Sequence, residues 1–170
     1  MKMKMLIIAV SLVSFFLATH VGAQESGLPL GLDYSMSRAQ VLAHTKLMAS
    51  YRVKDTKPNT IAFVVAAPDT NTKNGLFLDF VRDRLVEIAS MKSEMNKAMY
   101  DTYMESLLSQ ANKWKAAGVE TVWEDKNNST YLYKDDKSYI TISGGALFKD
   151  KNKFSVTITF TDHQHHDRKK

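Results

Sequence analysis

A long amphipathic stretch, residues 93–118, constrains this chain more than any other feature. Its apolar residues recur at spacings of three and four, which places them on one helical face: Met95, Met99, Tyr103, Leu107, Ala111 and Trp114. Ser93 is predicted to cap the helix, and Gly118 to end it in the left-handed conformation. About 24 helical residues make a rod of roughly 36 Å, long enough to cross a small sheet.

The first 23 residues have the organisation of an export signal. Lys2 and Lys4 precede an apolar run, residues 6–18, and Val21-Gly22-Ala23 supplies a small-residue cleavage site. A membrane anchor is the alternative, but about 13 apolar residues fall short of the roughly 20 that span a bilayer. We therefore expect a signal peptide over residues 1–23, a mature chain without a transmembrane segment, and a periplasmic or secreted location.

Composition narrows the classes of protein that remain. Removing residues 1–23, which hold two lysines and no acidic residue, leaves 147 residues with a net charge of +3, against +5 for the whole chain. This length suits one domain. Because the arginines are few and scattered, we do not expect a nucleic-acid partner. The lack of cysteine excludes thiol catalysis, thiolate metal sites and disulfides, so a packed core must stabilise the fold.

Shorter elements are predicted on both sides of the long helix. Ser37 and Gln40 form a capping box that starts a helix running from Arg38 to about Leu47. A hairpin is predicted around Arg82-Asp83, and Gly144-Gly145 is expected to form a bulge or bend. Alternating or apolar runs predict strands at residues 51–54, 60–67, 76–81, 85–90, 119–124, 130–133, 138–143 and 154–161. In the last of these, the threonines alternate with apolar residues, which predicts one wet face.

The order of helix, strands, helix, strands predicts an α+β fold with two helices packed on antiparallel β-meanders. The same order is consistent with a duplicated helix-plus-meander unit. We assign residues 24–162 to a single domain and residues 163–170 to a mobile charged tail.

One segment resembles known exported proteins. Leu30-Gly31-Leu32 followed by residues 36–42 (MSRAQVL) is similar to the opening of small bacterial outer-membrane assembly lipoproteins of the SmpA/OmlA type and of the β-lactamase inhibitory protein. The resemblance implies a non-catalytic, partner-binding α+β module. The sequence departs from the pattern at Asp33-Tyr34-Ser35, which separates the glycine segment from the helix, and in lacking a lipid-bearing cysteine.

Aromatic residues of the second meander are the main candidates for binding: Trp123, Tyr131, Tyr133 and Tyr139. Tyr and Trp combine a large apolar area with a polar tip, which suits interfaces. Tyr131 and Tyr133 share one face of their strand and leave Leu132 for the other. The alternative is that the tyrosines cover the core edge beneath the long helix.

Other side chains offer weaker sites. His163, His165 and His166 are candidate metal ligands, with a solvated tail as the alternative. Carboxylates at strand ends, Glu124, Asp125, Asp135 and Asp136, are candidates for acid–base work, although interleaved lysines favour solvated turns.

The sequence contains no recognisable catalytic motif and predicts no cofactor. We therefore expect an exported, non-catalytic protein that binds a protein or envelope component through the aromatic meander. A small secreted hydrolase using the strand-end carboxylates is the alternative, and metal sequestration by the tail is a third possibility.

Overall fold

The computed structural model describes residues 28–65 and 72–168, so the expected signal peptide lies outside the described residues. The helical elements are the 3-10 helix η1 (Pro29–Gly31), α2 (Arg38–Leu42), α3 (Thr45–Ser50), α4 (Lys97–Ala116) and α5 (His163–Arg168). The strands are β1 (Tyr51–Thr56), β2 (Thr60–Val65), β3 (Lys73–Val81), β4 (Arg84–Met95), β5 (Glu120–Asp125), β6 (Thr130–Lys134), β7 (Ser138–Ala146) and β8 (Phe154–Asp162).

The strands form one continuous antiparallel sheet in the order β1-β2-β3-β4-β8-β7-β6-β5. The first four strands and the last four are each a meander, and the two meanders join where β4 pairs with β8. An α+β fold is therefore confirmed, with a larger share of sheet than expected. The expectation of two helices is not confirmed, because residues 28–65 and 72–168 contain four α-helices.

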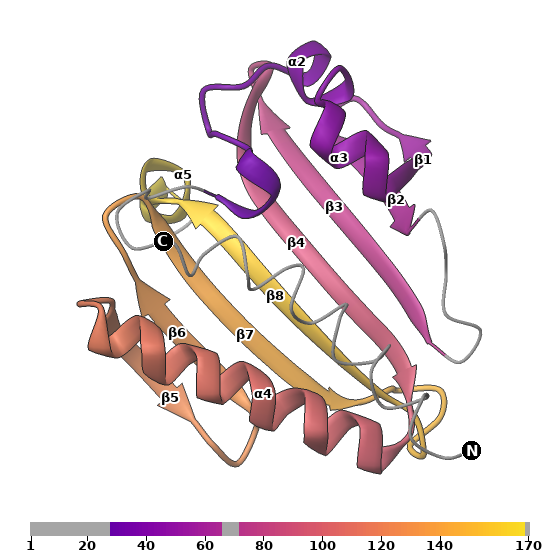
Figure 1. Ribbon diagram of the computed structural model, residues 1–170, viewed down its shortest axis with the longest axis vertical. Coiled ribbons are helices and arrows are strands. Elements are labelled where there is room, and N and C mark those ends of the chain that lie inside the picture. Colours follow the sequence, from indigo (N-terminus) through magenta and orange to yellow (C-terminus); the bar gives the residue numbers. More distant parts are fainter. Residues whose placement is uncertain (1–27, 66–71, 169–170) are drawn as a thin grey trace.

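Helices α2, α3 and α4 cover one face of the sheet (Figure 1). The core lies beneath them, because alternate strand residues point to that face. Its strand residues include Ile61, Phe63, Leu76, Leu78, Phe80, Ile88, Ile140, Ile142, Val156, Ile158 and Phe160. The predicted alternation of the last strand is confirmed from Val156 to Phe160, since Val156, Ile158 and Phe160 are buried. Thr161, which the sequence predicts on the wet face, is buried as well.

Helix α4 starts later than the sequence suggested. Ser93 lies in β4, and the helix is capped by Asn96, whose side chain accepts a hydrogen bond from the Met99 amide at 2.9 Å. Ser93 qualified by residue type, but it pairs with Lys73 of β3, and pairing of Met95 with Phe154 of β8 continues the strand to Met95. The predicted end is confirmed, because Gly118 has a φ of +96°.

The first predicted helix is broken in two. The capping box of Ser37 and Gln40 is confirmed, but α2 ends at Leu42. The His44 ring then accepts a hydrogen bond from the Leu47 amide at 3.3 Å and so caps α3. The His44 side chain, a hydrogen-bond acceptor, therefore divides into two helices a segment that apolar periodicity alone predicts as one.

The backbone tests two further predictions, a hairpin and a bulge. Arg82 and Asp83 both have positive φ, at 52° and 60°, which matches the twist of the predicted β3–β4 hairpin. Gly144 and Gly145 do not form the expected bulge, because the register of β7 with β8 runs through them unbroken.

Candidate functional site

The second face of the sheet carries an extended uncharged surface, which we call the sheet field. Its residues occupy two adjacent rows across β2, β3, β4, β8, β7 and β6, and each is partly exposed. They are Ala62, Val64, Gly75, Phe77, Ala89, Met91, Thr130, Leu132, Thr141, Ser143, Thr157 and Thr159. The wet threonine face that the sequence predicted for β8 lies at the centre of this field.

Charged and aromatic residues surround the sheet field. Asp79 and Glu87 lie opposite each other in the next row, and Glu87 accepts a hydrogen bond from the Thr161 hydroxyl at 3.2 Å. At the β5 edge, Trp123 pairs in register with Leu132 and is 50% exposed. The sheet field therefore has an uncharged centre and a charged border, and protein interfaces are likewise depleted of charge at the centre and polar at the rim.

The predicted aromatic residues divide between the two faces of the sheet. Tyr131 and Tyr133 point toward α4 and are buried, and Tyr133 makes an edge contact with Trp114 at a centroid distance of 6.2 Å. Burial raises the pKa of Tyr133 to about 12. Trp123 and Tyr139 lie on the second face. The four residues therefore do not form one surface, and of them Trp123 borders the sheet field.

The three candidate metal ligands lie in α5, in the segment expected to be a tail. Two of their rings pack on Tyr139: His166 stacks at 3.7 Å and His163 tilts at 5.0 Å between centroids. Among the described residues, no three His, Asp or Glu side chains are grouped to hold a metal ion. The histidines thus cover one end of the second face, and metal binding by them stays a prediction.

The strand-end carboxylates act in turns and ion pairs. Glu124 pairs with Lys115 at 2.6 Å, and that hydrogen bond lowers the Glu124 pKa. Asp125 accepts hydrogen bonds from the Asn128 side chain and from the amides of residues 127 and 128, which lower its pKa. Asp135 accepts from the amides of residues 137 and 138. General acid catalysis needs a raised pKa, and Glu124 and Asp125 are shifted the other way.

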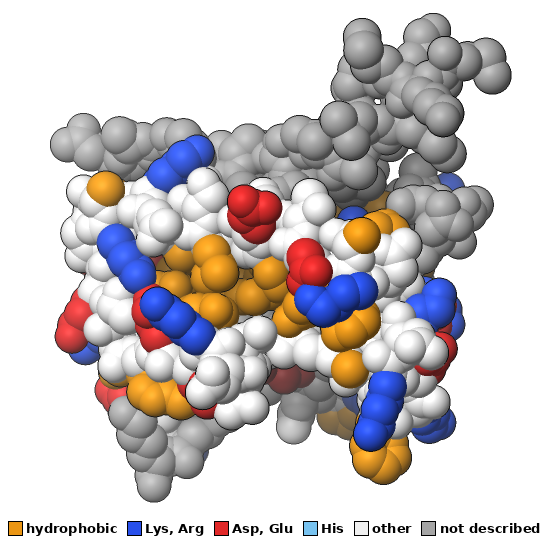
Figure 2. All heavy atoms as spheres, turned by 90° about the horizontal axis from the view of Figure 1, so that it is seen from below, with side chains coloured by type: hydrophobic (Ala, Val, Ile, Leu, Met, Phe, Trp, Pro, Cys, Tyr) orange, Lys and Arg blue, Asp and Glu red, His pale blue; other side chains and the backbone are white. Residues whose placement is uncertain are grey.

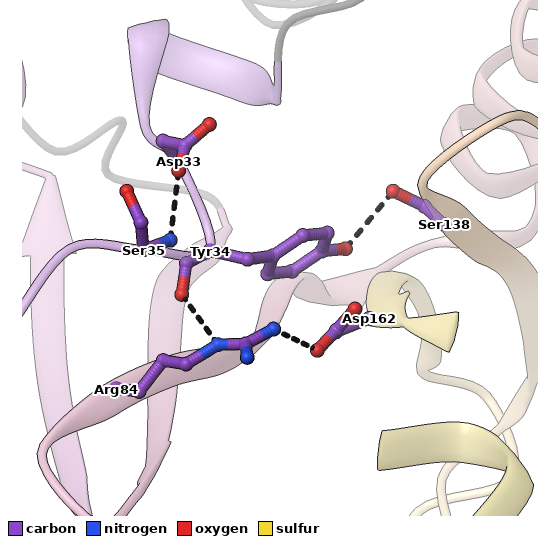
Figure 3. Close-up of polar contacts among 6 residues, drawn as sticks. All are labelled: Asp33, Tyr34, Ser35, Arg84, Ser138 and Asp162. Carbon is purple, nitrogen blue, oxygen red and sulfur yellow. Dashed lines mark hydrogen bonds and ion pairs between the residues drawn. The ribbon is translucent and has the colours of Figure 1, made fainter. Parts of the chain in front are cut away.

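A polar clasp joins the two meanders at one end of the sheet (Figure 3). Arg84, at the start of β4, pairs with Asp162 of β8 at 2.5 Å and donates to the Tyr34 carbonyl at 3.0 Å. The Tyr34 hydroxyl donates to the Ser138 hydroxyl at 3.0 Å, and burial raises the Tyr34 pKa. A cleft of about 640 Å³ opens beside these residues. No sequence pattern predicts the clasp, because its members are far apart in the chain.

A third feature is a groove of about 550 Å³ between α4 and the β5–β6 turn, lined by both apolar and polar residues. Met104, Leu108 and Tyr131 lie along it, and Asp101 and Glu105 lie at its rim. Figure 2 shows the molecule from the lower end of Figure 1, with hydrophobic side chains in a hollow bordered by charged ones.

Comparisons of the chain with protein-family models, with curated proteins and with solved structures found no match. The resemblance to exported assembly and inhibitory proteins therefore stays a hypothesis. Within the part of the chain that the structure describes, no helix is long and apolar enough to cross a membrane.

Proposed function

We propose that this protein is a non-catalytic binding module whose sheet field docks a folded protein. One observation carries the proposal: the sheet field places two uncharged rows across six strands on a face that α2, α3 and α4 leave open. The solvated face of an antiparallel sheet is usually polar. The sheet field instead mixes threonine and serine with alanine, valine, leucine, methionine and phenylalanine. Because the centre is uncharged, a partner can cover it without removing water from charged side chains, which would cost free energy.

The dimensions of the sheet favour a protein over a small molecule. Eight strands at about 4.8 Å spacing span roughly 34 Å, and a nine-residue strand is about 30 Å long. Allowing for the shorter edge strands and for the end that α5 covers, the whole face offers on the order of 800 Å², the area that one partner contributes to a standard interface. The sheet field is the uncharged centre of this area, and its charged border makes up the rest. A small ligand would need a concave pocket instead, and the two clefts described above, beside the clasp and beside α4, are lined by residues outside the sheet field.

Trp123 is the anchor that we assign to this interface. It is the exposed member of the aromatic set, it borders the sheet field, and tryptophan is enriched among residues that dominate binding energy. Tyr131 and Tyr133 support the field from beneath by packing β6 against α4.

The compartment and ancestry are part of the same proposal. The export signal in residues 1–23 puts the chain in the periplasm or outside the cell, where the partner would be a protein or another envelope component.

A duplicated helix-plus-meander unit is also part of the proposal. Each meander follows a helical segment, and from either edge of the sheet four consecutive strands run inward to the centre, which supports a duplication. A partner-binding role also agrees with the resemblance noted in residues 30–42.

The hydrolase alternative has less support. Its carboxylates cap turns or pair with lysine, as described above, and the lowered pKa values of Glu124 and Asp125 keep these groups ionised. The geometry therefore favours binding.

Crosslinking from the sheet field tests the proposal. A photo-crosslinking amino acid at Thr159 should trap a partner in envelope extracts, and that partner is then purified and titrated against the chain. Thr159→Arg should weaken binding at least about tenfold because it buries an unpaired charge. Trp123→Ala should also weaken it, whereas Ala116→Arg, an exposed position on α4, should not. Equal binding by Thr159→Arg would overturn the proposal.

A further inference from the structure

The turn between β7 and β8 presents one aromatic ring fully to solvent. Phe148 is 99% exposed, although phenylalanine normally buries a large apolar area. The turn is ordered by its own hydrogen bonds: the Leu147 amide donates to the Lys153 carbonyl at 2.7 Å, and the Lys153 amide to the Asp150 carbonyl at 3.0 Å. Phe148 is therefore held outward on a fixed turn, which we call the knob (residues 147–153).

The knob is basic. It carries Lys149, Lys151 and Lys153 against a single acid, Asp150, and all four are exposed. The Asp150 carboxylate also accepts the Asn152 amide at 3.0 Å, so part of its hydrogen-bonding capacity is used within the turn. A surface that receives the knob should therefore combine an apolar hollow with acidic residues.

The groove beneath α4 has that combination. Its floor includes Met104, Leu108 and Tyr131, and its volume of about 550 Å³ exceeds the roughly 150 Å³ cavity that holds a benzene ring. Three charged residues also line it, the acidic Asp101 and Glu105 and the basic Lys97. Asp101 is paired with Lys97, whereas Glu105 has no cationic partner among the described residues.

The knob and the groove lie at the same end of the molecule. The base of the β7–β8 hairpin contacts the first turn of α4, since the Tyr100 and Phe154 rings lie 4.9 Å apart, and Figure 1 shows both elements at the lower end. Despite this proximity, the exposure of Phe148 shows that the knob does not fill the groove of its own chain.

We propose that the knob of one copy inserts into the groove of a second copy, and that the contact is reciprocal in a two-fold dimer. Because both features share one end, a single two-fold axis can make each Phe148 enter the other copy's groove. Two contacts are needed because of the buried area. One knob in one groove buries far less than the roughly 1,200–2,000 Å² of specific interfaces, and a second contact doubles the buried area. The lysines of the knob then face Glu105 of the other copy.

This dimer leaves the sheet field free. The groove belongs to α4 on the helix-covered face, whereas the sheet field lies on the opposite face. The dimer is thus independent of the proposed function, and it would present two sheet fields to partners.

Sedimentation of the full chain, as the cell processes it, tests the dimer. Concentrations from about 1 to about 100 μM cover the weaker affinities of such interfaces. The unaltered chain should sediment as a dimer. Phe148→Ser should raise the dissociation constant at least roughly thirtyfold, the loss expected for a central aromatic contact. Since Phe148 is fully exposed, its replacement should not affect folding, which circular dichroism checks.

Two further variants make the test specific. Ser109→Trp, at an exposed position beside the groove, should also give monomers. A mixture of Phe148→Ser and Ser109→Trp chains keeps one of the two contacts, because the first chain keeps a groove and the second keeps a knob. The mixture should therefore associate more strongly than either variant alone and more weakly than the unaltered chain. Lys149→Glu with Lys151→Glu should weaken the dimer, and adding Glu105→Lys should restore part of the affinity.

Three outcomes would overturn the proposal. The first is an unaltered chain that stays monomeric throughout the concentration range. The second is a dimer that survives Phe148→Ser. The third is a monomer that binds phosphatidylglycerol vesicles through Phe148, which would make the knob a lipid anchor instead.

Discussion

At the scale of single residues, Gly144 shows how a helix can approach a sheet. A Cβ atom at this position would lie 2.7 Å from the Tyr100 hydroxyl and 3.2 Å from the Met104 sulfur. Tyr100 is itself buried and packed on Phe154, so a Cβ at this position must displace its ring from that contact. Gly144 is thus required by packing, since its φ is not positive.

We predict that Gly144→Ala destabilises the fold by about 1–3 kcal/mol, the usual cost of overpacking a core. Gly145→Ala is the matched control, because a Cβ there meets nothing within 4 Å. It should change the free energy of unfolding by less than about 0.5 kcal/mol. Urea unfolding at neutral pH measures both, and equal effects would show that α4 does not rest on Gly144.

At the scale of elements, α4 is fastened at its far end by the Lys115–Glu124 pair. Lys115 lies in its last turn and Glu124 in β5, so the pair ties the helix to an edge strand. Lys115 also lies 5.4 Å from the centroid of the Tyr133 ring. Because both side chains are partly solvated, we expect the pair to contribute below about 1 kcal/mol.

The pH dependence of stability tests this pair. The Glu124 pKa is lowered by Lys115, so its contribution is complete above the ordinary value of 4.5 and is lost as pH falls through the lowered folded pKa. We predict that Glu124→Gln is less stable than the unaltered chain at pH 7 and that the difference shrinks to zero under acidic conditions. Urea unfolding from pH 7 to pH 2 measures it, and a difference independent of pH would exclude the ion pair as its cause.

Sequence patterns predicted most strands and the long helix, because alternation and helical spacing record burial directly. They misplaced the start of α4, since strand pairing between β3 and β4 outweighed the capping preference of Ser93. They also could not show that Tyr131 faces α4 while Trp123 faces the opposite side, because a bulge between Thr121 and Trp123 changes the register of β5. The sheet field depends on strand order, which no local pattern contains.

At the scale of the whole molecule, one core spans both meanders. Its residues run from η1 through β2 and β3 to β8, β7 and α4 without division. The β4–β8 pairing and the Arg84–Asp162 clasp connect the meanders at the centre and at one end. The two meanders should therefore unfold together rather than as separate units.

The positions of the tryptophans allow the joint unfolding of the two meanders to be measured. Both tryptophans, Trp114 and Trp123, lie in the second half of the chain, so their fluorescence reports on α4 and β5, whereas circular dichroism reports on all strands. We predict coincident urea transitions by the two methods. Ile61→Ala, at a fully buried site in β2, should cost about 2–5 kcal/mol. It should lower the fluorescence midpoint as much as the dichroism midpoint, although β2 is distant from both tryptophans in the sheet. If Ile61→Ala left the urea midpoint measured by fluorescence unchanged, the second meander would fold on its own. The molecule would then have two independent cores instead of one.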